Sequence, residues 1–113
     1  MKKRKKRDPA KTLDRKELKA WADDIKKRAG FKCEWCNATK YLNAHHIVDR
    51  RFLPLRYDRN NSMCLCPNHH KFLRGFSAHA NPIRVILWLE AHRPEALKIL
   101  IAIVKEALNE ENL

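Results

Sequence analysis

Apolar residues recur at helical spacing near both ends of the chain and lose that spacing between them. Over residues 12–29 the apolar positions form one stripe, namely Leu13, Leu18, Trp21, Ala22 and Ile25. The spacing predicts an amphipathic helix, with Gly30 as the residue that ends it. Residues 82–92 and 94–109 are apolar around most of their circumference, and each begins with a proline. They predict a C-terminal pair of helices within residues 81–110.

Residues 31–75 lack helical periodicity and predict short strands and a loop. The strands are expected at residues 41–48 and 61–66. Pro67 suits the first position of a short helix, which Gly75 would close. The expected order is helix, strand, strand, helix, helix, helix, which indicates one small α+β domain.

Charge separates a basic part of the chain from a nearly neutral part. The chain has 113 residues, 25 Lys and Arg against 13 Asp and Glu, and a formal net charge of +12. Positions 2–7 are all basic, and residues 32–74 hold eight basic against three acidic residues. We therefore expect a polyanion partner. We interpret residues 1–11 as a flexible basic arm ahead of a single domain over residues 12–113.

Several protein classes are excluded by what the sequence lacks. No apolar run reaches the roughly 20 residues of a membrane-spanning helix, because charged residues interrupt the C-terminal segment. The basic N-terminal run has no apolar stretch behind it and so does not resemble a secretory signal. The chain contains only two glycines, which argues against a glycine-rich phosphate loop. We therefore expect an intracellular, cytoplasmic protein.

Two short motifs have the spacing of zinc ligands. Cys33 and Cys36 form one pair, Cys66 and His69 form the other, and two residues separate the members of each pair. Such a turn lets both side chains reach one ion at tetrahedral angles, and two turns complete a closed structural site. Without an export signal, zinc is favoured over a disulfide, and the ion would stabilise a fold with a small core. We interpret Cys64 as a small core residue that shares a strand face with Cys66.

A second group of imidazoles lies around these motifs. His45 and His46 are adjacent on the first predicted strand, and His70 follows a zinc ligand on the predicted helix. Adjacent helical residues point about 100° apart, so His69 can face zinc while His70 faces another site. A neutral imidazole suits both divalent-metal binding and proton abstraction near neutral pH. Ideal strand alternation sends His45 and His46 to opposite faces, so a shared site requires the strand to end or bulge there.

Together these motifs resemble the HNH endonuclease family, with its ββα-metal fold, and in particular its zinc-ribbon-bearing subgroup. The stretch Ala44-His45-His46-Ile47-Val48 is similar to the first strand of that family. The stretch from Asn61 to Cys66 is similar to its second strand, and Cys66-Pro-Asn-His69-His70-Lys71 to the start of its helix. The resemblance covers residues 31–75. One departure is that the fourth zinc ligand, usually Cys in such members, would be His69.

The resemblance implies a role for each residue of the second group. His46 would be the general base that takes a proton from the attacking water. His45 and His70 would hold one divalent cation (Mg²⁺, Mn²⁺, Ni²⁺ or Zn²⁺) against the scissile phosphate. Asn61 would tie the loop between the strands and so fix where His46 points. The implied protein is a metal-dependent DNA endonuclease, similar to small phage or mobile-element nucleases.

Six basic residues near the expected site are candidates for phosphate contacts. They are Arg50, Arg51, Arg56, Arg59, Lys71 and Arg74. Phosphate contacts position a duplex without reading its sequence, so we expect double-stranded DNA bound with little sequence specificity. The alternative is a non-catalytic zinc-ribbon module or adaptor that binds nucleic acid, although such a protein has no need of His45, His46 and Asn61.

The other notable residues have simpler interpretations. We interpret His79 and His92 as surface residues and Trp35 as packing on the zinc ribbon. The C-terminal helices carry more apolar residues than one partner face can cover. They are expected to pack on the N-terminal helix through Trp21 and Ile25, and any remaining apolar surface would favour a homodimer or a docking surface for a protein partner.

Overall fold

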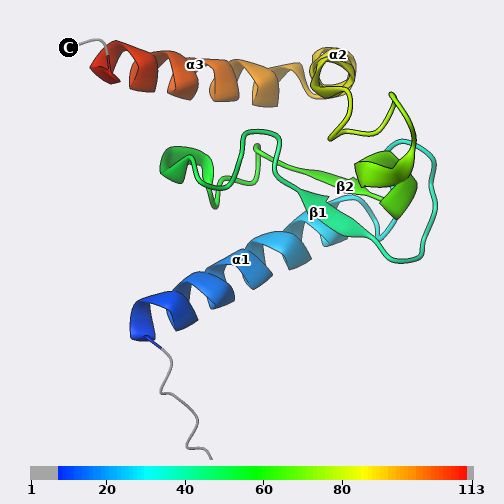
Figure 1. Ribbon diagram of the computed structural model, residues 1–113, viewed down its shortest axis with the longest axis horizontal. Helices are drawn as coiled ribbons and strands as arrows, with labels where there is room; N and C mark the ends of the chain where they lie inside the picture. The colour runs from blue at the N-terminus through cyan, green and yellow to red at the C-terminus, as the bar shows by residue number, and fades with distance from the viewer. Residues whose placement is uncertain (1–7, 112–113) are drawn as a thin grey trace, which may run out of the picture.

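The computed structural model describes residues 8–111, and these residues form a small α+β protein. Its elements are α1 (Pro9–Arg28), β1 (Asn43–His45), η1 (Leu53–Leu55), β2 (Met63–Leu65), η2 (Asn68–Phe72), α2 (Pro82–His92) and α3 (Pro94–Glu111). The β1–β2 hairpin lies between α1 on one side and the α2–α3 pair on the other (Figure 1). The predicted α+β class and the predicted order of elements are therefore confirmed. Within residues 8–111, no helix is long and apolar enough to cross a membrane.

Helix α1 begins three residues earlier than its apolar stripe predicts. The Asp8 carboxylate accepts a hydrogen bond of 3.0 Å from the Ala10 backbone N–H, and Pro9 follows as the first helical residue. An acidic N-cap followed by proline is a strong signal for the start of a helix. Neither residue belongs to the apolar stripe, so the stripe alone predicts a later start. The end of the helix is as predicted, because Gly30 has a φ of +67°. Of the predicted basic arm, residues 1–7 lie outside the described residues.

The two strands pair antiparallel, but each is only three residues long. The register places His45 opposite Met63 and Ala44 opposite Cys64. The predicted strand over residues 41–48 is therefore too long at both ends. Tyr41 has a φ of +57°, which no strand residue adopts, and the chain leaves the ladder after His45. His46 consequently lies beyond the strand, which meets the condition for His45 and His46 to serve one site.

The hairpin divides the core into two clusters. On one side Trp21 and Ile25 of α1 pack with Cys64. On the other side Met63 and Leu65 pack with residues of η1, α2 and α3, namely Leu55, Val85, Leu89 and Leu100. The prediction that the C-terminal helices pack on α1 through Trp21 and Ile25 is therefore wrong, because the hairpin separates them.

Cys64 is a buried core residue, as predicted, but it does not share a face with Cys66. Cys64 packs with the α1 cluster, whereas Cys66 belongs to the cluster on the α2–α3 side. Side chains alternate between faces only along a strand, and β2 ends at Leu65. Cys66 therefore starts the following turn instead of continuing the alternation.

The predicted helix over residues 67–74 is a single π-helical turn, η2. The Leu73 N–H donates to the Asn68 carbonyl at 2.8 Å, and Gly75, with a φ of +70°, redirects the chain. Helix α2 has the predicted bounds, and α3 begins at Pro94 as expected and continues to Glu111. Arg93, between α2 and α3, forms an ion pair of 3.4 Å with Glu34 and so ties the helical pair to the loop that carries Cys33 and Cys36.

Candidate metal centres

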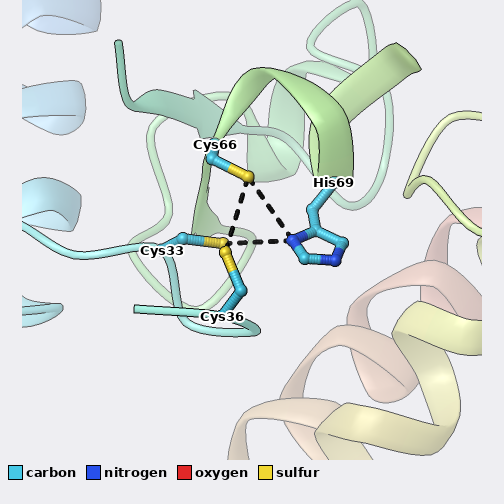
Figure 2. Close-up of side chains that lie close together, drawn as sticks. All are labelled: Cys33, Cys36, Cys66 and His69. Carbon is cyan, nitrogen blue, oxygen red and sulfur yellow. Dashed lines mark hydrogen bonds between the residues drawn. The ribbon is translucent and has the colours of Figure 1, made fainter. Parts of the chain in front are cut away.

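Cys33, Cys36, Cys66 and His69 converge on one point from two segments of the chain. Figure 2 shows the three sulfur atoms and the His69 ring facing a common centre, with Cys33 and Cys36 on the loop after α1 and the other two flanking the start of η2. The four ligand atoms all lie within 4.8 Å of one another. The Cys36 and Cys66 sulfurs are 3.7 Å apart, and His69 Nδ1 lies 3.6 and 3.4 Å from the Cys33 and Cys66 sulfurs.

These distances fit the edges of a zinc tetrahedron. With Zn–S near 2.3 Å and Zn–N near 2.05 Å, tetrahedral angles require S···S of about 3.8 Å and S···N of about 3.6 Å. A disulfide would instead bring two sulfurs to about 2.05 Å, and the four cysteines are free thiols. The predicted ligand set therefore lies close enough to bind a metal ion such as zinc.

Local backbone structure places each ligand pair. The Asn37 N–H donates to the Cys33 carbonyl at 2.9 Å, and Asn37 takes a φ of +64°, which closes the first turn tightly. In the second turn the His70 N–H donates to the Cys66 carbonyl at 2.8 Å. Trp35 packs edge-on against the His69 ring with ring centroids 5.6 Å apart. The interpretation of Trp35 as a residue that packs on the ribbon is thus confirmed.

A second cluster, which we call the three-histidine cluster, consists of His45, His70 and His79. One ring nitrogen from each lies within 4.8 Å of the others, and the Nε2 atoms of His70 and His79 are 3.0 Å apart. The His45 ring centroid lies 5.1 Å from that of His70 and 5.0 Å from that of His79. His45 and His70 thus approach each other at the end of β1, where the sequence predicted them.

His79 is the residue of this cluster that sequence analysis missed. It is exposed, as predicted, but it also faces two other imidazoles. Eight residues lie between His79 and His70, which is no recognised ligand spacing. It reaches the cluster because the Ala78 N–H donates to the His69 carbonyl at 2.7 Å and the His79 N–H donates to the His70 carbonyl at 3.2 Å. The proximity of His79 to His70 therefore follows from the tertiary fold and not from the spacing of the two residues in the sequence.

The environment of the cluster keeps two of its rings neutral. Burial lowers the pKa of His45 to about 3, and the neighbouring His70 and His79 imidazoles lower it further. Burial, with His79 and Lys71 nearby, lowers the pKa of His70 to about 4. Both rings therefore carry a free nitrogen lone pair at neutral pH, which is the form that binds a metal ion.

His46 lies beside the cluster in a defined orientation. Its Nε2 is 2.8 Å from the Arg56 backbone carbonyl, and since a carbonyl only accepts, Nε2 carries the ring proton. Nδ1 therefore keeps its lone pair and is able to accept a proton. The ring also stacks on Trp21, with centroids 3.8 Å apart and planes 10° from parallel. Burial lowers the pKa of His46 as well.

Asn61 connects the chain after β1 to the start of β2. Its side chain is fully buried, its Oδ1 accepts from the Val48 N–H at 2.7 Å, and its Nδ2 donates to the Val48 and Leu55 carbonyls at 2.9 and 3.1 Å. These three hydrogen bonds tie Asn61, at the end of the loop that follows His46, to Val48 near its start and to Leu55 in its middle.

The six basic candidates divide by their surroundings. Arg50, Arg51 and Lys71 line a depression of about 590 Å³ together with His46 and the three-histidine cluster. Arg56 instead donates two hydrogen bonds, of 2.8 and 2.6 Å, to Asp14 of α1, and Arg59 forms an ion pair of 2.9 Å with Asp24. Arg74 lies exposed after η2. Arg56 and Arg59 thus fasten the loop to α1. Arg51 pairs with Asp49 at 3.0 Å, which leaves Arg50, Lys71 and Arg74 better placed to meet phosphates.

Comparisons of the chain with protein-family models, with curated proteins and with solved structures found no match.

Proposed function

We propose that this protein is a metal-dependent endonuclease of the HNH type, which hydrolyses DNA phosphodiester bonds with one divalent cation and a histidine general base. The observation that carries the proposal is the convergence of His45 and His70 beside His46 within one basic depression. A zinc-binding scaffold alone requires none of these three residues. Phosphodiester hydrolysis uses all of them, because it needs both a cation and a base.

Each residue has a defined part in this chemistry. His45 and His70 would hold the cation, which neutralises charge that develops on the phosphate and on the leaving oxygen. His46 would accept a proton at Nδ1 from the attacking water, because its Nε2 proton is committed to the Arg56 carbonyl. Arg50 and Lys71 line the same depression and would bind flanking phosphates without reading bases, whereas Arg51, which also lines it, pairs with Asp49.

The competing function is a zinc-ribbon module that binds nucleic acid without cutting it, or an adaptor. It would use the Cys₃His cluster and the basic residues in the same way. Such a module does not need His45, His46 and His70 in one depression, and the nuclease is therefore the better proposal. The two functions are separated by whether bound DNA is cut.

The test is cleavage of supercoiled plasmid in the presence of Mg²⁺, Mn²⁺, Ni²⁺, Zn²⁺ or EDTA. We expect cleavage that EDTA abolishes. His46→Ala should lower the rate about 100-fold or more, as expected for loss of a general base. His92→Ala is the matched control, because His92 is exposed on α2 and does not line the depression.

Both variants should keep their zinc and their affinity for DNA. Undiminished cleavage by His46→Ala would remove His46 as the base. DNA binding by the wild type with no cleavage under any metal would overturn the nuclease and favour the binding module.

A further inference from the structure

The three-histidine cluster contains one more ligand than the proposed cleavage site uses. We propose that His79 completes a three-imidazole metal site with His45 and His70, and that this site selects a transition-metal cation such as Ni²⁺, Co²⁺ or Zn²⁺ over Mg²⁺. The inference deepens the proposed function. Only the catalytic role of the bound metal rests on that function. Binding of the metal itself is measurable without cleavage.

The spacing of the ring nitrogens suits a shared ion. Two nitrogens bound to one metal at about 2.1 Å lie about 3.0 Å apart at a right angle and about 3.4 Å apart at the tetrahedral angle. The Nε2 atoms of His70 and His79 are 3.0 Å apart. A hydrogen bond between these two rings would account for that distance, but it would not bring in His45. All three residues offer a nitrogen within 4.8 Å of the others, as three ligands of one ion must.

The position of His79 is built into the fold. The segment before it is closed by backbone hydrogen bonds to η2, from Ala78 N–H to the His69 carbonyl and from His79 N–H to the His70 carbonyl. Ser77 and Ala78 are buried, so the turn that carries His79 is packed against the protein. The exposed His79 ring therefore projects from a fixed backbone toward the other two rings.

The donor atoms determine the class of cation. Three imidazole nitrogens suit Zn²⁺, Ni²⁺ and Cu²⁺, whereas Mg²⁺ prefers oxygen ligands and retains its water. Asp49 also lines the depression, but its carboxylate pairs with Arg51 at 3.0 Å. Three protein ligands leave open positions, which water and a phosphate oxygen would occupy.

Metal binding tests the inference directly. The zinc-loaded full chain is titrated with Ni²⁺ by calorimetry, and its metal content is measured after dialysis. We expect one Ni²⁺ per chain beyond the zinc, and millimolar Mg²⁺ should not displace it. His79→Ala should weaken Ni²⁺ binding about tenfold or more. Loss of a residue that only hydrogen-bonds to a metal ligand already lowers metal affinity about 10–100-fold. His92→Ala should bind Ni²⁺ like the wild type.

Unchanged Ni²⁺ affinity in His79→Ala would overturn the third ligand, and displacement of Ni²⁺ by Mg²⁺ would overturn the cation class. Circular dichroism and zinc content report folding. If His79→Ala lost its fold, His79→Phe would replace it, because Phe keeps an aromatic ring without a metal-binding nitrogen. His79→Asp should restore binding and shift preference toward Mn²⁺, which a purely structural role of His79 would not produce.

The outcomes also separate this inference from the proposed function. Ni²⁺ binding that depends on His79, without any plasmid cleavage, would remove the nuclease and leave the metal site. Cleavage that depends on His46, with Ni²⁺ affinity unaffected by His79→Ala, would remove the third ligand and leave the nuclease.

Discussion

At the scale of single residues, His46 is held by contacts from parts of the chain outside its motif. Trp21 of α1 stacks on its ring, and the Arg56 carbonyl accepts its Nε2 proton. The Arg56 side chain is in turn bound by Asp14, which is also on α1. Helix α1 therefore orients the proposed base, although the resemblance to the HNH family begins only after this helix.

Asn61 provides a test of how this loop is organised. Asn61→Ala should destabilise the fold by about 3 kcal/mol, because it removes the partners of three backbone groups and each buried unpaired group costs about 1–3 kcal/mol. Urea denaturation at neutral pH measures the change. Asn43→Ala is the control, since Asn43 makes one exposed hydrogen bond and its loss should cost less than about 1 kcal/mol. Equal effects of the two substitutions would show that Asn61 does not hold the loop.

At the scale of elements, η2 supplies a ligand to each of the two clusters. His69 presents Nδ1 to the three cysteines, while the next residue, His70, faces His45 and His79. The two candidate metal centres are thus adjacent along one turn. Any ion that fixes this turn through His69 also fixes the direction of His70.

Loss of a zinc ligand should therefore disturb both centres. Cys36→Ser is the best variant, because Cys36 is exposed and the substitution opens no cavity in the core. We expect loss of bound zinc, a lower melting temperature and weaker Ni²⁺ binding, since binding free energy at a structural zinc site contributes directly to folding. Metal analysis, thermal melting and calorimetry are the measurements.

Cys64→Ala is the matched control for this prediction. Cys64 is buried in the α1 cluster and is not one of the four converging ligands, so this variant should keep its zinc. A Cys36→Ser protein that kept both its zinc and its stability would contradict the ligand assignment. Zinc loss in Cys64→Ala would do the same, because the sulfur would then belong to the site.

Local patterns predicted some of these features, and long-range packing decided the rest. The clustering of Cys33, Cys36, Cys66 and His69 follows from two-residue spacings, and the bounds of α2 follow from Pro82 and the break before Pro94. The late start of β1 depends on Tyr41, whose positive φ has no signature in an apolar pattern. Likewise His79 reaches the cluster through backbone hydrogen bonds, which periodicity does not encode.

At the scale of the whole molecule, a basic surface and an apolar surface adjoin at the three-histidine cluster. The depression beside the three-histidine cluster is lined by Arg50, Arg51 and Lys71. Helices α2 and α3 instead expose large apolar side chains, among them Ile83 and Leu87, which are 68% and 61% exposed. A homodimer or partner contact through these helices stays a prediction. Because Ile83 lines a pocket together with His45, His46 and His79, such a contact would lie beside the three-histidine cluster.

The salt dependence of DNA binding tests where phosphates lie on this surface. Each phosphate contact contributes about −0.9 to the slope of log affinity against log salt. Lys71→Ala should therefore reduce the magnitude of that slope by about 0.9 and weaken binding equally for all sequences. Lys98→Ala removes the same charge from α3, where Lys98 pairs with Glu95, and should leave the slope unchanged. Fluorescence anisotropy with a labelled duplex at several salt concentrations measures both slopes. An equal change of slope in the two variants would mean that DNA binding depends on the net charge of the chain and not on contacts in the depression beside the histidines.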